Sequence, residues 1–113
     1  MTLYEFKLRK GKIETVEHGA KETAKQYIIL HGRIDYNCLS RIPKKLIGEV
    51  LGGGRCGLSC LLVENDIETA RKAFINFYES EQIPYCERAV QIANEAMEEA
   101  KNELACLKDQ IDI

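Results

Sequence analysis

Five basic residues in the middle of the chain are the side chains best suited to bind an anion. They are Arg33, Arg41, Lys44, Lys45 and Arg55. A guanidinium group donates paired hydrogen bonds to phosphate or carboxylate oxygens, and an ammonium group adds a compact charge. This segment has the least regular pattern in the chain, and loops are the usual carriers of binding residues. We therefore expect an anion-binding site with these five donors; an ordinary solvated loop is the alternative.

A glycine run at residues 52–54 lies beside Arg55, and its backbone N–H groups could approach the same ligand. A Walker loop would need a GK[ST] ending that opens a helix, and a dinucleotide fingerprint needs a helix after its glycines. Here Arg55 and Cys56 lead into an apolar segment typical of a strand. The run therefore predicts a flexible connection and not a loop that hydrolyses nucleotides.

The nucleophilic and metal-ligating residues form no recognisable set. Cys56 and Cys60 could join His18 or His31 around zinc, but a strand would hold the two thiols about 13 Å apart unless the segment curled. No third group that would orient a Cys–His pair is identifiable. Carboxylates at helical spacing near Lys101 are typical of a solvated face. These are Glu95, Glu98, Glu99 and Glu103. We expect a non-enzymatic protein with no catalytic residue, metal or cofactor.

Apolar residues recur at alternating spacings of three and four towards the C-terminus. They are Ile83, Cys86, Val90, Ala93, Met97, Ala100, Leu104, Leu107 and Ile111. Such a heptad seam is typical of a helix that packs against another helix, and charged residues fill its opposite face. Because a lone helix of this kind is marginally stable, we expect a homo-oligomer, most simply a dimer, formed through the C-terminal helix. Packing onto the chain's own sheet is the alternative.

A shorter helix is expected near residues 66–79, capped by Asn65 or Asp66. Its apolar stripe ends at Glu81 and Pro84, and proline removes a backbone donor. The stripe consists of Ile67, Ala70, Phe74 and Phe77. Two helices follow from this break, near residues 66–79 and 83–110, as a helical hairpin or a kinked helix.

The first half of the chain has strand-like alternation. In residues 3–9, Tyr4, Phe6 and Leu8 share one face and the charged residues share the other. Lys10 and Gly11 suit a tight hairpin turn to a second strand at residues 12–18. Residues 25–30 and 58–63 predict further strands, residues 33–39 a short strand, and residues 43–47 one helical turn. The fold class is therefore α+β: an antiparallel sheet of four or five strands, then two C-terminal helices.

Composition fits one domain over residues 1–113, with a β-rich half at 1–64 and a helical half at 65–113. The 113 residues are 45% apolar and 30% charged, and no apolar run approaches the roughly 18 residues of a membrane span. Residues 1–12 are charged throughout, without the apolar core of a signal peptide. The five cysteines are an odd number with no CxxC pair, which favours reduced thiols. We expect a cytoplasmic protein that does not enter a membrane.

The net charge of −2 hides a division along the chain. Residues 1–63 hold 11 Lys and Arg against 6 Asp and Glu, a net +5, whereas residues 64–113 hold 5 against 12, a net −7. This asymmetry predicts an acidic or phosphate-bearing partner for the basic half, such as an anionic small molecule, unless the two halves attract each other. A nucleic-acid-binding regulator is the alternative function, although its Lys and Arg would usually be denser.

Three groups of residues carry a resemblance to a known class of proteins. They are Lys21, Glu22, Thr23, Lys25 and Tyr27; Arg41, Ile42, Lys44, Ile47, Gly48 and Val50; and Leu62, Glu64, Asp66 and Ala70. With the charged C-terminal helix, the chain resembles small accessory proteins of phages and prophages of Gram-positive bacteria. That class includes anti-defence factors such as the Thoeris anti-defence sponges, which have a sheet followed by C-terminal helices and sequester cyclic nucleotide signals as oligomers.

The resemblance implies a phage-encoded anti-defence factor in the host cytoplasm, which sequesters an anionic, nucleotide-like ligand or inhibits a host protein. One departure concerns the sponge family itself. Beyond Arg88 the C-terminal helix has no arginine to hold a phosphate. No functional residue is therefore carried over from that family.

Overall fold

The structure, a computed structural model, describes residues 1–34, 36–52 and 57–111. Its strands are β1 (Thr2–Arg9), β2 (Lys12–Glu22), β3 (Gln26–Ile29), β4 (Arg41–Pro43), β5 (Val50–Gly52) and β6 (Leu58–Leu62). Two 3₁₀ turns, η1 (Tyr36–Cys38) and η2 (Lys44–Leu46), flank β4. The helical segments are α1 (Ile67–Phe77), η4 (Tyr78–Gln82) and α2 (Ile83–Ile111). Contacts divide the chain into a first unit, Met1–Phe77, and a second unit that begins at Tyr78.

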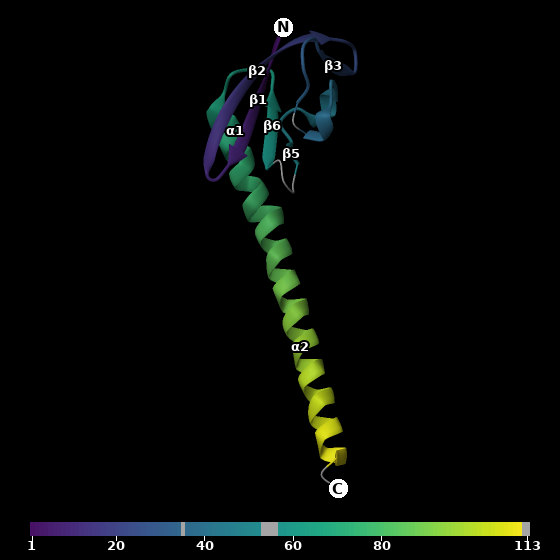
Figure 1. Cartoon of the computed structure of the whole chain (residues 1–113). Coiled ribbons are helices and arrows are strands. Elements are labelled where there is room, and N and C mark those ends of the chain that lie inside the picture. Colours follow the sequence, from purple (N-terminus) through teal and green to yellow (C-terminus); the bar gives the residue numbers. More distant parts are fainter. Residues whose placement is uncertain (35, 53–56, 112–113) are drawn as a thin grey trace. The chain divides into compact units, whose positions relative to one another are not determined.

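The first unit is built on a curled antiparallel sheet with the strand order β4-β3-β2-β1-β6-β5 (Figure 1). The eleven-residue strand β2 pairs with all of β1 and, through its last residues, with β3. Lys10 and Gly11 both have positive φ, at 51° and 77°, which is the conformation that a two-residue type I′ hairpin requires. The predicted first hairpin is therefore confirmed, with a second strand that runs four residues beyond its predicted end.

The sheet has six strands, so the predicted number of four or five is wrong. The missed strands, β4 and β5, have three residues each, too few for alternation to mark them. No strand forms in the described part of residues 33–39, because Asn37 and Cys38 have φ of 52° and 53°, outside the region that strands use. The predicted helical turn at residues 43–47 is present as η2, and Gly48 follows it with a φ of 82°.

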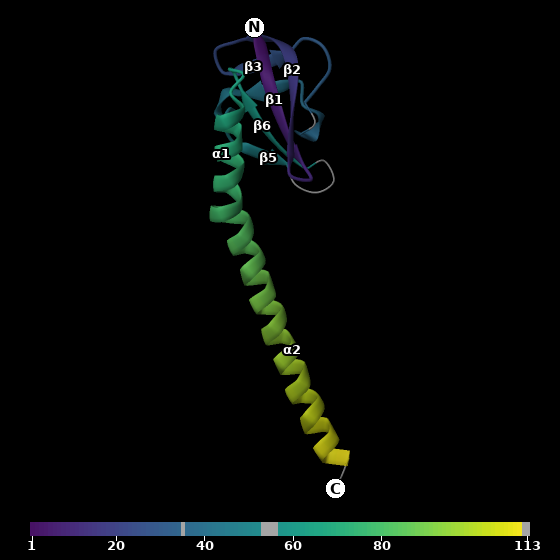
Figure 2. The same ribbon diagram turned by 90° about the vertical axis from the view of Figure 1, so that its left-hand side faces the viewer.

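Both faces of the sheet carry a core. The inner face, which bears Leu3 and Ile29, is lined by Leu3, Ala20, Tyr27, Ile29, Ile34, Ile42, Leu51 and Leu61. The outer face bears Phe6 and Cys60, and α1 packs there through Ala70 and Phe74 (Figure 2). Of the predicted stripe of α1, these two residues are buried, whereas Ile67 is exposed.

Glu5 lies on the charged face that the alternation of residues 3–9 predicts, but it is buried there. Its side chain is 1% exposed, because the curled sheet covers the inner face of β1 as well as the face that packs against α1. Strand alternation alone marks two faces but does not show that both are buried.

The two predicted helices are joined without a loop, so a helical hairpin is wrong. Residues 67–111 are helical over 45 residues, and the bounds of α2 agree with the predicted 83–110 within one residue. In a regular helix the N–H of residue 84 would bond to the carbonyl of Ser80, but Pro84 cannot donate and its ring needs space. The π-helical turn η4 lies directly before this point, and its wider turn accommodates the proline.

Within the described residues, no helix has the length and low charge that crossing a membrane requires.

Candidate functional site

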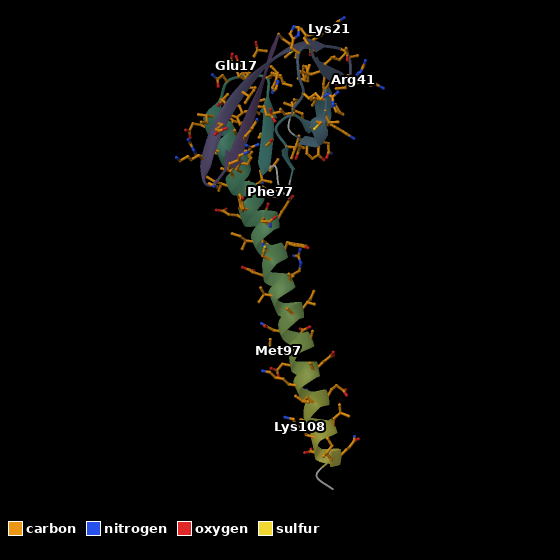
Figure 3. All side chains as sticks on the ribbon, in the orientation of Figure 1. Glu17, Lys21, Arg41, Phe77, Met97 and Lys108 are labelled. Atoms are coloured by element: carbon orange, nitrogen blue, oxygen red, sulfur yellow. The ribbon has the colours of Figure 1, made fainter. Side chains whose placement is uncertain are left out.

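Lys21, Ile28 and Arg41 form a basic row on the outer face of the sheet. The register pairs Lys21 with Ile28 and Ile28 with Arg41, and residues paired across antiparallel strands share a face. Lys21 and Arg41 are exposed on either side of half-buried Ile28, and Figure 3 shows them near the same end of the sheet. Adjacent strands lie about 4.8 Å apart, so the two basic side chains start about 10 Å from each other and can converge on one anion.

The strand register places Arg41 near Lys21, which is not among the five predicted donors. Lys21 lies beyond the predicted end of the second strand, and only the β2–β3–β4 register brings it near Arg41. Arg33 is exposed after Gly32, and Lys45 is exposed in η2; neither belongs to the basic row. Arg55 lies outside the described residues. Arg41 is therefore the predicted donor that belongs to the basic row; the other predicted donors within the described residues do not.

Lys44 already has partners within the sheet unit. Its Nζ lies 2.7 Å from Oε1 of Glu22 and 5.4 Å from the centre of the Tyr27 ring. Glu22 and Tyr27 are paired in the β2–β3 register, so Lys44 covers the ring and compensates the carboxylate. A role in ligand binding stays a prediction, and it would require Lys44 to give up or share this carboxylate.

Gly52, the first residue of the glycine run, and Gly57 after the run allow close packing of the backbone. A Cβ on Gly52 would lie 2.5 Å from the carbonyl oxygen of Gly57, and one on Gly57 would lie 2.8 Å from the carbonyl oxygen of Leu8. Both have positive φ, at 109° and 74°, which side chains disfavour. The ends of β5, β6 and β1 therefore need glycine here for steric reasons. The predicted backbone contacts to a ligand from residues 53–54 lie outside the described residues.

A buried polar pair, Glu5 and His18, lies on the inner face. Nε2 of His18 is 2.8 Å from Oε1 of Glu5, and the residues are 8% and 1% exposed. Ser59 is buried too, but it pairs with Lys7, whereas His18 pairs with Leu3. Four residues along β1 correspond to about 13 Å, so Ser59 and His18 cannot act as nucleophile and base. The Glu5–His18 pair satisfies the polar groups of a core.

His18 and Cys60, which the sequence disfavours as joint zinc ligands, face opposite sides of the sheet. Cys60 pairs with Phe6 on the outer face, and His18 lies on the inner face. No three His, Cys, Asp or Glu side chains gather as a metal site in the part of the chain that the structure covers, which omits Cys56. Burial, with the nearby carboxylate of Glu49, raises the pKa of the Cys60 thiol to about 11. Cys60 is therefore a protonated core residue at neutral pH and a poor nucleophile.

The seam of α2, composed of the nine residues found in the sequence, is an uncovered apolar surface. None of the described residues of α2 is buried. The large side chains of this apolar seam are 49% exposed at Ile83 and 81% exposed at Ile111, with the others between these values. Met97 projects from the middle of α2 in Figure 3. A contiguous apolar surface on a helix that is charged elsewhere indicates an interaction site, and here it suggests oligomerisation through the helix.

Comparison with known proteins gives no match to any family model, curated protein or solved structure.

Proposed function

We propose that this protein is a non-enzymatic binding protein that works as a homo-oligomer held together by α2. Its sheet unit captures an anionic, nucleotide-like ligand at the basic row. The observation that carries this proposal is the apolar seam, which runs the length of a helix with no buried residue. We propose that the protein acts as a phage anti-defence factor and that its ligand is a nucleotide signal.

Association of α2 is supported by the balance of free energies. Removing one large apolar side chain from water contributes about 1.5–3 kcal/mol. Six such side chains per helix can therefore offset an association cost of about 4–15 kcal/mol, even when each is only partly buried. No described residue of α2 is buried, so the helix by itself lacks the apolar burial that would compensate the cost of ordering it.

Capture of an anion is supported by charge. The side chains of Lys21 and Arg41 in the basic row make no hydrogen bond or ion pair with any other residue that the structure describes. Residues 1–63 carry a net +5, which attracts an anion over a longer range. Arg41 can supply the paired hydrogen bonds that phosphate oxygens accept.

Sedimentation velocity at micromolar concentration tests the oligomer. We expect a mass above the 12.9 kDa of one chain, and Ala100→Glu should dissociate the assembly because it places a carboxylate in the seam. Asn102→Glu adds the same charge on the opposite side of the helix and should leave the assembly intact. A wild-type protein that sediments only as a monomer would rule the proposal out.

Calorimetry against cyclic nucleotides, linear nucleotides and a short duplex DNA tests the ligand. Loss of one charge-assisted hydrogen bond costs about 1.5–3 kcal/mol, so Arg41→Ala should weaken nucleotide binding about tenfold or more. Lys72→Ala, an exposed cation of α1, is the matched control. Binding to DNA alone, with steep salt dependence, would favour the nucleic-acid regulator. No binding to any of these probes would leave a protein partner as the better proposal.

A further inference from the structure

We infer that the partner of α2 is a second copy of this chain in antiparallel orientation. The inference rests on the proposed homo-oligomer and goes beyond it by fixing the direction of the partner helix. The large side chains occupy one heptad position, called a here: Ile83, Val90, Met97, Leu104 and Ile111. The other seam position, called d, is mostly small: Cys86, Ala93, Ala100 and Leu107.

This division of volumes favours antiparallel packing. A parallel pair stacks a on a and d on d, so Ala93 and Ala100 would each meet another alanine and leave gaps between crowded layers. An antiparallel pair places each a residue opposite a d residue of the partner. Large side chains then fill the space that small ones leave, which is how a close-packed core is built.

One register pairs every d residue with an a residue. When Met97 lies opposite Ala93 of the partner subunit, Val90 lies opposite Ala100 of the partner subunit. In the same register Leu104 lies opposite the partner's Cys86, and Ile83 lies opposite the partner's Leu107. The two-fold symmetry makes each of these layers occur twice, so all four d residues of both helices are paired in the homodimer.

The charges beside the seam support the same orientation. The flank next to position d carries Glu87 in the N-terminal half of α2, and Lys101 and Lys108 in the C-terminal half. Antiparallel pairing sets this flank against itself in reverse, so Glu87 approaches Lys101 or Lys108 of the partner subunit. Parallel pairing would set it against the opposite flank, where Glu103 could pair with Lys108 of the partner subunit but Glu87 and Lys101 would face no charged residue.

Disulfide trapping in the full-length protein tests the orientation. The parent variant carries Cys38→Ser, Cys56→Ser and Cys106→Ser and keeps Cys86 and the buried Cys60. Under mild oxidation the parent should stay uncross-linked, because antiparallel helices hold the two Cys86 residues near opposite ends. Adding Leu104→Cys should produce a covalent dimer, joined between Cys86 and the new thiol of the partner, which mass spectrometry of peptides identifies. Adding Asn102→Cys instead, on the solvated side, is the control and should not cross-link.

Charge reversal provides a second measurement that leaves the seam intact. Glu87→Lys should raise the dissociation constant of the dimer about two- to tenfold, the range expected for exposed ion pairs, and adding Lys101→Glu and Lys108→Glu should restore it. A disulfide between two Cys86 residues, or no rescue by the added reversals, overturns the antiparallel orientation and leaves the oligomer standing. A monomeric wild-type protein overturns the oligomer itself, so the two failures are distinguishable.

Discussion

At the scale of single residues, some polar side chains of this protein are paired with each other and others are exposed without a partner among the described residues. Glu5 and His18 satisfy each other inside the curled sheet, and Lys44 compensates Glu22 beside Tyr27. Lys21 and Arg41, by contrast, point to the outer face, where a ligand can reach them. Buried Glu5 and His18 are therefore paired with each other, and the exposed cations Lys21 and Arg41 are the ones available to bind a ligand.

Glu5→Leu should lower the free energy of unfolding by about 1–3 kcal/mol, because it leaves buried His18 without its carboxylate acceptor. Urea unfolding followed by circular dichroism measures the change. The double variant Glu5→Leu with His18→Leu removes both polar groups and should recover part of the loss. A single variant as stable as the wild type would show that the pair contributes nothing.

Alkylation should separate the thiols by burial. In the native protein at pH 8, iodoacetamide should modify exposed Cys38 and Cys106 within minutes, whereas Cys60 should react only after unfolding. The raised pKa of Cys60, about 11, keeps its thiol protonated at this pH, and burial blocks the reagent. If α2 is paired, Cys86 should also react more slowly than Cys106, and Ala100→Glu should remove that difference. Peptide mass spectrometry gives all these rates.

At the scale of elements, α1 shows how local chemistry starts a helix and tertiary packing holds it. Oδ1 of Asp66 accepts a 3.1 Å hydrogen bond from the backbone N–H of Thr69, and its Oδ2 accepts a 2.6 Å bond from the Thr69 hydroxyl. Ala70 and Phe74 then fix the helix on the sheet. Between the two predicted capping residues, the structure assigns the cap to Asp66.

Asp66→Ala should lower the thermal midpoint of the sheet unit at pH 7, because α1 loses its N-terminal cap. The hydrogen bonds from Thr69 lower the pKa of Asp66, so the contribution of the cap is present above the pKa of the unfolded chain. It is lost as the pH falls through the lowered, folded-state pKa. The gap between wild type and variant should therefore close in acid, whereas Asn65→Ala should show little effect at either pH. A gap that persists below the folded-state pKa would contradict this assignment.

At the scale of the whole molecule, the two units differ in charge and in burial. The first unit carries the basic half of the chain and its buried cores. The second is a helix with charged and apolar sides, and none of its described residues is buried. A helix with this pattern gains its stability from a partner and not from its own length. Folding of α2 and assembly should therefore be coupled.

The helical signal of α2 should depend on protein concentration. Diluting the wild type from about 50 μM to well below the dissociation constant should lower both the ellipticity at 222 nm and the thermal midpoint, since mass action favours the separate chains. Ala100→Glu should show the low-ellipticity state at every concentration, and Asn102→Glu should follow the wild type. A signal that is independent of concentration would mean that α2 is stable alone.

The sequence by itself determined the α+β class, the first hairpin, α1 and the seam of α2. Each depends on a short-range pattern: alternation in β1, a turn at Lys10 and Gly11, and a heptad repeat that begins at Ile83. These patterns act between residues close along the chain, so they can be recognised without knowing which segments meet.

Only the tertiary structure decided the strand number, the burial of Glu5, the pairing of Lys21 with Arg41 across Ile28, and the continuity of the helix past Pro84. The first three depend on which strands become neighbours and in which register, and a shift of one residue would reverse every face. The last depends on a wider helical turn that composition does not reveal. Local propensity therefore determined the longer elements, whereas long-range pairing determined the short strands and which side chains meet.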